Sequence, residues 1–399
     1  MLEWRVSTIL EKIKAGGDSA LREVIEEVED YVPAELKVSE DEFEAAVEKV
    51  PVALRQAIDE SAARIETIHR SRIPMDQEWT DGTGGMCRRR YFPVRRVGLY
   101  VPGGEAPLIS IVLTLGTLSR LAGCRERIIC TPPSEYGAVP PSVLYAASVC
   151  GVKDVYKVGG AQAIAAMAYG TDTIGKVDKI FGPGDRSVMK AKGIASKEGI
   201  AVDLTSGPTE TMILSDESAK VRIMAADFLA QAEQSPDSQV ILLCGDITVA
   251  RMVLQEIDSR KRHLPRKDII EDAMAGSRII VFRNLDDRVA FANMYAPGRL
   301  ILAVKDPEEV ASRIEAAGLV VLGHHSPGSA CDYVCGAGDI LPTGGAATAW
   351  GGIGVESFTR SVIYQSINDE GLASLAKTMI TLAEAETFQA RAEAVNLRL

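Results

Sequence analysis

The stretch DVYKVGGAQAIAAMAYG (154–170) carries the pattern that decides the fold. It begins with a short apolar, β-branched run typical of a buried strand. The Gly159-Gly160 pair then predicts a turn, and residues 161–169 favour a helix. The same order of strand, glycine turn and helix recurs at RVGLYVPGG (96–104) and at KIFGPG (179–184). This alternation predicts a mostly parallel sheet with helices on both faces.

A second set of apolar runs lies further along the chain, after a helix expected at 217–234. The runs are QVILLCG (239–245), RIIVF (278–282), RLILAV (299–304) and GLVVLG (318–323). Their length and composition predict a second parallel sheet. We expect helices within residues 1–70, one of them beginning at Ser39. We also expect a loop or hairpin at 76–90 and a final charged helix at 369–395.

Composition excludes several classes of protein. The net charge of -11 and a pI near 5.1 argue against a nucleic-acid partner, which usually selects a basic surface. No apolar run reaches about 18 residues, so no membrane span is expected. The first residues lack the apolar segment of a signal peptide. The seven cysteines are dispersed and form no CxxC pair, which favours reduced thiols and a cytoplasmic location.

Three polar motifs could carry chemistry. Glycine-rich turns at 98–104, 158–163 and 182–186 could approach an anionic ligand, or could be ordinary turns. Gln231 and Gln234 share a helix face, which could equally be a solvated helix end. The segment HHSPGSACDYVCGAGD (324–339) offers zinc-type side chains but no standard zinc spacing. Cys331 in this segment could be a nucleophile only if a nearby base lowered its pKa.

Taken together and in this order, the motifs resemble those of the histidinol dehydrogenase family. The resemblance covers about 5–397 and rests on GLYVPGG, VYKVGGAQAIAAMAYGT, VDKIFGPG, SGPTE, DFLAQAEQSPDSQVILL and LPTGGAA. It implies an α/β fold with two Rossmann-like parallel-sheet domains, small helical N- and C-terminal elements, and a homodimer. The implied ranges are 1–20 for the N-terminal element, 21–99 with 216–353 for one domain, 100–215 for the cofactor-side domain, and 354–399 for a C-terminal element packed on the partner.

The family oxidises an amino alcohol in two NAD-linked steps, with one zinc and a Glu-His pair as base and acid. Its zinc ligands are Gln, His, Asp and His. The corresponding positions here hold Gln231, Gln234, Asp332 and Arg391. Both imidazoles are therefore missing, and a guanidinium cannot ligate a metal because it stays protonated. On this basis zinc is not expected, and NAD is the expected cofactor.

The catalytic pair is also replaced, because Gly298 and Arg299 stand at its positions. Neither serves as a base near neutral pH. Asp339 stands where the family has a substrate-facing His. The candidate bases are therefore Asp339, Asp332 and Glu386. The candidate substrate-binding residues are Thr209, Gln231, Gln234, Arg299 and Arg391.

On the cofactor side the resemblance points to Tyr100, Gln162 and Asp185. Asp185 replaces an Asn of the family, and its carboxylate would repel a pyrophosphate.

These substitutions predict a zinc-independent, NAD-linked oxidoreductase that acts on the CH–OH group of a small anionic substrate other than histidinol. The two arginines motivate the anionic class, since guanidinium groups bind carboxylate, phosphate or sulfonate. Three alternatives remain. The chain could be a non-catalytic paralogue that binds a metabolite or a partner protein. Arg391 could simply pair with Asp332 across a dimer. Relocated metal ligands at His324, His325 or Cys335 could preserve the family's activity.

Overall fold

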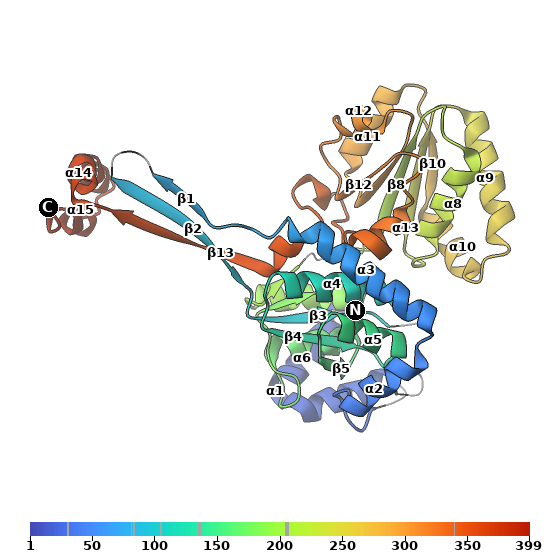
Figure 1. Cartoon of the computed structure of the whole chain (residues 1–399), viewed down its shortest axis with the longest axis horizontal. Helices are drawn as coiled ribbons and strands as arrows, with labels where there is room; N and C mark the ends of the chain where they lie inside the picture. The colour runs from blue at the N-terminus through green and yellow to red at the C-terminus, as the bar shows by residue number, and fades with distance from the viewer. Residues whose placement is uncertain are drawn as a thin grey trace.

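The computed structural model describes residues 1–29, 32–80, 82, 84–103, 106–134, 137–203, 207–338 and 340–399. It contains two five-stranded parallel sheets, each with helices on both faces, and a long arm that leaves the body of the molecule (Figure 1). The expected α/β class with two Rossmann-like sheets is confirmed.

The first sheet has the strand order β5-β4-β3-β6-β7, and all its strands are parallel. Its strands are β3 (Arg96–Tyr100), β4 (Glu126–Thr131), β5 (Asp154–Lys157), β6 (Lys179–Phe181) and β7 (Ala201–Val202). The helices between them are α4 (Ile109–Leu121), α5 (Pro141–Val149), α6 (Gly160–Tyr169) and α7 (Arg186–Lys197). Small and aliphatic side chains fill the core; six residues of α6, for example, are alanines or glycines.

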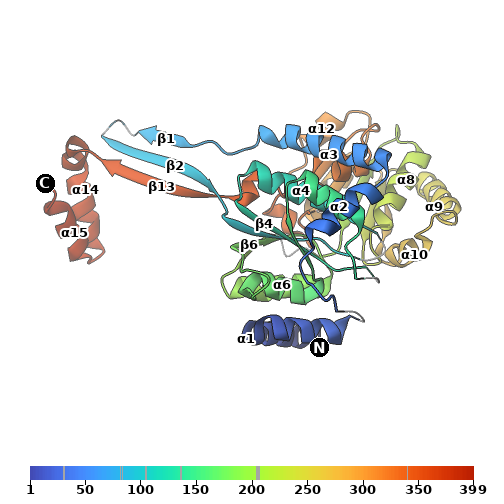
Figure 2. The ribbon, with the colours of Figure 1, turned by 60° about the horizontal axis from the view of Figure 1, so that its bottom comes forward.

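Three N-terminal helices pack against the helices that cover this first sheet. They are α1 (Leu2–Val28), α2 (Glu40–Lys49) and α3 (Val52–Arg70). α1 buries Leu10 and Ile13 against α6 and α7, and Figure 2 shows it lying outside α6. α3 buries Ile65 in the core on the opposite face. The sequence predicts that residues 21–99 form one domain with residues 216–353. These three helices instead bury side chains in the hydrophobic cores around the first sheet, so we propose that residues 2–70 belong to the first unit.

Local signals explain where these helices begin and bend. Ser39 begins α2 as expected, with its side chain accepting from the Glu42 backbone while the Glu42 carboxylate accepts from the Ser39 backbone. α1 is interrupted at Gly17, whose φ of 56° is in the left-handed region that glycine adopts without strain.

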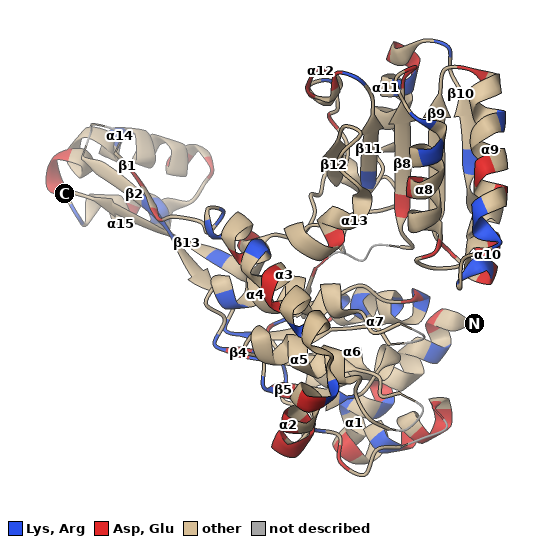
Figure 3. Cartoon of the chain, turned by 45° about the vertical axis from the view of Figure 1, so that its right-hand side comes forward, with Lys and Arg blue, Asp and Glu red and all other residues tan. Residues whose placement is uncertain are grey.

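The second sheet has the order β10-β9-β8-β11-β12 and is also parallel throughout. Its strands are β8 (Glu210–Ser215), β9 (Gln239–Cys244), β10 (Arg278–Val281), β11 (Arg299–Ala303) and β12 (Leu319–Leu322). The helices are α8 (Val221–Ala232), α9 (Ile247–Lys261), α10 (Lys267–Gly276), α11 (Leu285–Tyr295), α12 (Pro307–Ala311) and α13 (Gly328–Ala330). Figure 3 shows charged residues on the outer side of α9, whose apolar side faces the sheet.

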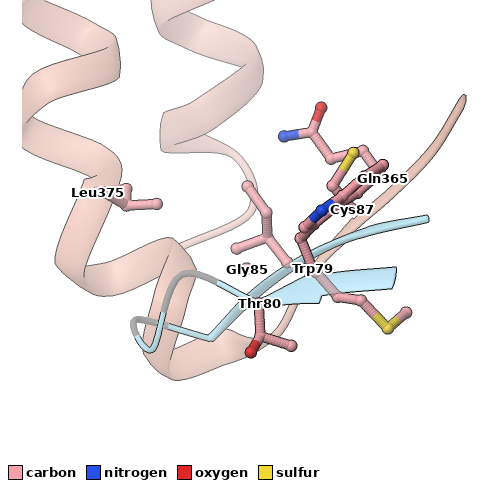
Figure 4. A pocket seen from close by; sticks show the side chains of 8 residues that line it. Trp79, Thr80, Gly85, Cys87, Gln365 and Leu375 are labelled. Atoms are coloured by element: carbon pink, nitrogen blue, oxygen red, sulfur yellow. The ribbon is translucent and has the colours of Figure 1, made fainter. Parts of the chain in front are cut away.

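The arm is a three-stranded antiparallel sheet of order β1-β2-β13. Its strands are β1 (Gln77–Thr80), β2 (Gly85–Pro93) and β13 (Thr359–Ile367). Two helices, α14 (Asp369–Ala385) and α15 (Gln389–Asn396), cover its tip. A small hollow lies there, lined by Trp79, Cys87 and Leu375 among others (Figure 4). The hairpin expected at 76–90 is present. The expected single helix at 369–395 is instead two, separated near Thr387, which has a φ of 63°.

No helix in the described part of the chain is both long and apolar enough to cross a membrane. All seven cysteines are free thiols.

Candidate functional site

A cleft of about 570 Å³ lies between the two sheet units. This volume lies within the range of small-molecule sites. The first unit contributes the turns that follow β3 and β6, including Gly103 and Asp185. The second unit contributes the segment before β8 and the end of α8. The predicted site residues that line the cleft are Asp185, Thr209, Gln231, Gln234 and Asp332.

Arg299 lies beside this cleft, at the first position of β11, and is only 1% exposed. Its Nη1 donates to Gln231 Oε1 at 2.7 Å, and its Nη2 donates to the Gly338 carbonyl at 2.9 Å. The guanidinium also forms an ion pair with Asp332. Thr211 Oγ1 donates to the same Gln231 oxygen at 3.0 Å. Arg299 therefore holds together Gln231 and Asp332, two residues at the positions of zinc ligands in the family.

Glycine makes room for this arginine. A Cβ atom at Gly338 would lie 2.0 Å from Asp332 Oδ1 and 2.6 Å from Arg299 Nη2. A Cβ atom at Gly328 would lie 2.9 Å from Gln231 Nε2. A larger residue at either glycine would displace the side chains of Arg299, Asp332 or Gln231. The backbone therefore packs tightly against these side chains here.

Gly298, at the position of the family's catalytic Glu, is tightly enclosed. A Cβ atom there would lie 2.8 Å from the Pro342 carbonyl oxygen and 3.3 Å from that of Glu210. A side chain at this position would have to displace backbone. The space that a carboxylate would need is thus filled by the protein itself.

Two of the residues expected on the cofactor side, Tyr100 and Gln162, form hydrogen bonds within the first unit. The Tyr100 hydroxyl accepts from the Gly160 backbone N–H at 3.0 Å, and burial raises the pKa of this phenol. Gln162 Nε2 donates to Glu29 Oε1 at 3.1 Å, and burial raises the pKa of that carboxyl. Tyr100 and Gln162 therefore support the turns behind the cleft. Asp185 reaches the cleft and caps α7, where its Oδ1 accepts from the Val188 backbone N–H at 2.8 Å.

A buried ion pair, which we did not predict, fixes the turn after β6. Lys192 and Asp203 pair with side chains that are 0% and 1% exposed. Lys192 Nζ donates to the Gly182 carbonyl at 2.9 Å, and the Gly182 N–H donates to Asp203 Oδ2 at 2.7 Å. Gly182 has a φ of 126° and lies against the Tyr100 carbonyl, so only glycine fits. The one signal in the sequence is a lysine on the apolar side of an expected helix.

The two C-terminal candidates lie away from the cleft within one chain. Glu386 and Arg391 pair at 3.5 Å with mostly exposed side chains, at the tip of the arm (Figure 1). Within the chain, Asp332 pairs with Arg299 and not with Arg391. The remaining candidate base, Asp339, lies outside the described residues.

The described residues of the segment 324–339, namely 324–338, do not gather metal ligands. His324 Nε2 lies 2.9 Å from Ser218 Oγ, and the Cys335 carbonyl contacts His69 Nε2 at 3.0 Å. No group of three or more His, Cys, Asp or Glu residues that could hold a metal occurs among the described residues. Burial raises the pKa of Cys331 to about 11, so its thiol is not an activated nucleophile.

Two Rossmann-like parallel sheets with one cleft between them define an α/β protein of the doubly wound class. The family model described as histidinol dehydrogenase matches residues 1–399. The chain is 42% identical over 395 residues to histidinol dehydrogenase of Xanthomonas campestris pv. campestris (strain ATCC 33913), covering 99% of this chain and 92% of that protein. It is 39% identical over 396 residues to that of Vibrio vulnificus (strain YJ016), covering 99% and 91%.

The crystal structure of histidinol dehydrogenase from Elizabethkingia anophelis superposes with a TM-score of 0.96 at 40% identity, covering 100% of this chain and 92% of that one. The chain therefore belongs to the histidinol dehydrogenase family of oxidoreductases.

This membership corrects the expectation about zinc. We expected none, because Gln234 and Arg391 replace two histidine ligands. The chain matches the histidinol dehydrogenase family over its whole length, and by the resemblance above that family binds zinc. The expectation that zinc is absent is therefore wrong. In the arrangement described here the donor set does not fit the ion, because Arg299 donates to the oxygen atoms of Gln231 and Asp332. Zinc at these positions would require Arg299 to release them.

Proposed function

We propose that this chain is an NAD-linked oxidoreductase that acts on the CH–OH group of a small anionic molecule other than histidinol. The cleft carries the proposal, because it joins the turns after β3 and β6 to Thr209, Gln231, Gln234 and Asp332 in a single cavity. In parallel sheets a dinucleotide lies beyond the carboxyl ends of the strands, which is where those turns are. Gly298, which offers no base at the family's position, argues for a substrate other than histidinol.

A single alcohol-to-carbonyl step needs few groups. The hydroxyl proton passes to a base, and the carbon-bound hydrogen leaves as hydride; NAD, when bound, supplies the hydride acceptor. Asp332 is the described candidate base that lines the cleft. Gln231 and Thr209 can orient the hydroxyl from the same side. Arg299 is a positioning residue, because it holds the Asp332 carboxylate through an ion pair.

The first test is calorimetric titration of the whole chain, with its metal content measured, against NAD and NADP. We expect saturable binding of NAD, followed by NAD reduction with an alcohol that carries a carboxylate, phosphate or sulfonate group. L-histidinol is included in the same panel as the control substrate. Turnover of histidinol at a rate equal to or above that of every anionic alcohol would contradict the proposed substrate class.

A non-catalytic paralogue is the second candidate. Asp185 favours it, because its carboxylate caps α7 at the turn where the negative charge of a pyrophosphate would lie. Absence of binding for both dinucleotides would select this candidate. For either candidate we propose a cytoplasmic location, supported by the seven free thiols.

We further propose a homodimer in which α14 and α15 reach the partner's cleft. These helices leave Leu382 61% and Phe388 45% exposed at the end of the arm, far from the core of their own chain. In a dimer, Glu386 and Arg391 could then join a cleft that they do not reach in one chain. Sedimentation equilibrium of the whole chain should give twice the 42.8 kDa mass. A monomer at tens of micromolar would refute this arrangement.

A further inference from the structure

We propose that Arg266 binds the anionic group of the substrate in the cleft. This inference rests on the proposed function and names the residue that would select the substrate class. It replaces the expectation that Arg299 performs this role. The Arg299 guanidinium already donates to Gln231 and the Gly338 carbonyl and pairs with Asp332.

Arg266 has a fixed place in the second unit. It immediately precedes α10, and the Ile270 backbone N–H donates to its carbonyl at 3.1 Å. α10 in turn buries Ile270 and Ala273 completely in the core of the unit. The backbone that carries the guanidinium is thus anchored, which lowers the entropic cost of binding a ligand.

The guanidinium of Arg266 is available. Among the described residues it has no hydrogen bond or ion pair, and its Nε is buried without a partner. Of the described residues that line the cleft, it is the one lysine or arginine; the charged others are Asp185, Glu233 and Asp332. The Nε atoms of Arg55, Arg89, Arg96 and Arg299 are also buried without a hydrogen-bond partner, but among these arginines only Arg266 lines the cleft. An anion bound in the cleft would supply the acceptor that this donor lacks.

The ligand chemistry follows from the shape of the group. A guanidinium presents parallel N–H donors that match a carboxylate, phosphate or sulfonate. Arg266 lines the cleft from the second unit, together with Gln234 and Ser235, whereas Asp185 lines it from the first unit, on the proposed cofactor side. Negative charge is therefore favoured near Arg266 and disfavoured near Asp185. This asymmetry assigns the anion to the substrate and not to the phosphates of the dinucleotide.

The test uses the whole chain and three defined probes: inorganic phosphate, malonate and methanesulfonate. Their binding is measured by calorimetry without dinucleotide, for the native chain, Arg266→Gln and Arg266→Lys. We expect at least one probe to bind the native chain and to bind Arg266→Gln about tenfold or more weakly, the scale of a charge-assisted hydrogen bond. Arg266→Lys keeps the positive charge but lacks the parallel N–H donors of the guanidinium. Its affinity for the probe should lie between those of the native chain and Arg266→Gln. Arg251→Gln, an exposed arginine of α9, is the matched control and should bind like the native chain.

The remaining outcomes separate the inference from the proposed function. Equal binding by Arg266→Gln and the native chain, or no binding of any probe to the native chain, overturns the inference. Weaker NAD binding by Arg266→Gln with unchanged binding of the probes overturns the assignment to the substrate and points to a cofactor phosphate. A third outcome is that a probe binds and needs Arg266 for binding, while the native chain binds neither NAD nor NADP. That outcome supports the anion site but overturns the proposed oxidoreductase function.

Discussion

Replacing Arg299 by methionine is expected to lower the free energy of unfolding by about 3–5 kcal/mol, the usual cost of removing one partner from a buried ion pair. The methionine keeps much of the volume but none of the donors. The Asp332 carboxylate, with its side chain only 19% exposed, would lose its counter-charge. The Gly338 carbonyl would lose a hydrogen bond of 2.9 Å. All these interactions are lost together, because one guanidinium donates to Gln231 and to the Gly338 carbonyl and pairs with Asp332.

Urea unfolding of the native chain and of Arg299→Met measures this effect. Arg313→Met is a matched control in the same unit, because Arg313 forms an ion pair with Asp286 whose side chains are 39% and 81% exposed. Exposed pairs contribute about 0–1 kcal/mol, so this control should remain close to the native chain. Equal effects of the two substitutions would show that the buried cluster is not a special source of stability. Arg299→Met combined with Asp332→Asn should recover part of the loss, because no uncompensated carboxylate remains.

Lys192→Met is expected to have an effect of similar size, about 3–5 kcal/mol, because it leaves the Asp203 carboxylate buried without its cation. The Asp203 side chain is 1% exposed, so water cannot replace the lysine without local opening. The substitution should also loosen the turn at Gly182, whose N–H and carbonyl are bound by Asp203 and Lys192. This turn leads into Pro183, Gly184 and Asp185, which line the cleft where we propose that NAD binds. The proposed binding of NAD should therefore weaken together with stability.

Thermal and urea unfolding, followed by NAD titration under folding conditions, test both parts. Lys37→Met is the control, because Lys37 pairs with Asp154 at 2.6 Å in the same unit with both side chains about half exposed. We expect the control to keep both the stability and the NAD affinity of the native chain. A Lys192→Met chain as stable as Lys37→Met would contradict the role assigned to the buried pair.

Much of the fold was accessible from the sequence because it depends on local patterns. Short β-branched runs ending in glycine turns predicted both parallel sheets, and Ser39 predicted the start of α2. Strand β13 was missed, since six of its nine residues are exposed and none is buried, and its partner β2 lies far away in the sequence. Alternation alone is weak evidence when neither face of a strand is buried. The placement of α1–α3 on the first sheet is likewise a matter of tertiary packing.

The candidate site was predicted in part. The resemblance identified Gln231, Gln234, Thr209, Asp332 and Asp185, and all of them line one cleft. The pairing of Asp332 with Arg299 within the chain was not predictable, because Arg391 and Arg299 are equally suitable by chemistry. Pairing of Arg391 with Asp332 across a dimer stays a prediction. Lys192 and Arg266 were missed for a similar reason. Neither stands in a motif. Complete burial marks Lys192, and a position in the wall of the cleft marks Arg266, and both depend on tertiary packing.

In the arm, the central strand is synthesised long before one of its two neighbouring strands. β2 is the central strand of its sheet, and β13 covers one side of it from Thr359 to Ile367. β13 is translated only after both parallel sheets, so one edge of a nascent β2 has amide and carbonyl groups without a strand partner until residues 359–367 have been made. Such an open edge is a template for pairing with a strand of another molecule. A chain cut or terminated before residue 359 would keep that edge permanently, and we expect it to aggregate even though both of its sheets are intact.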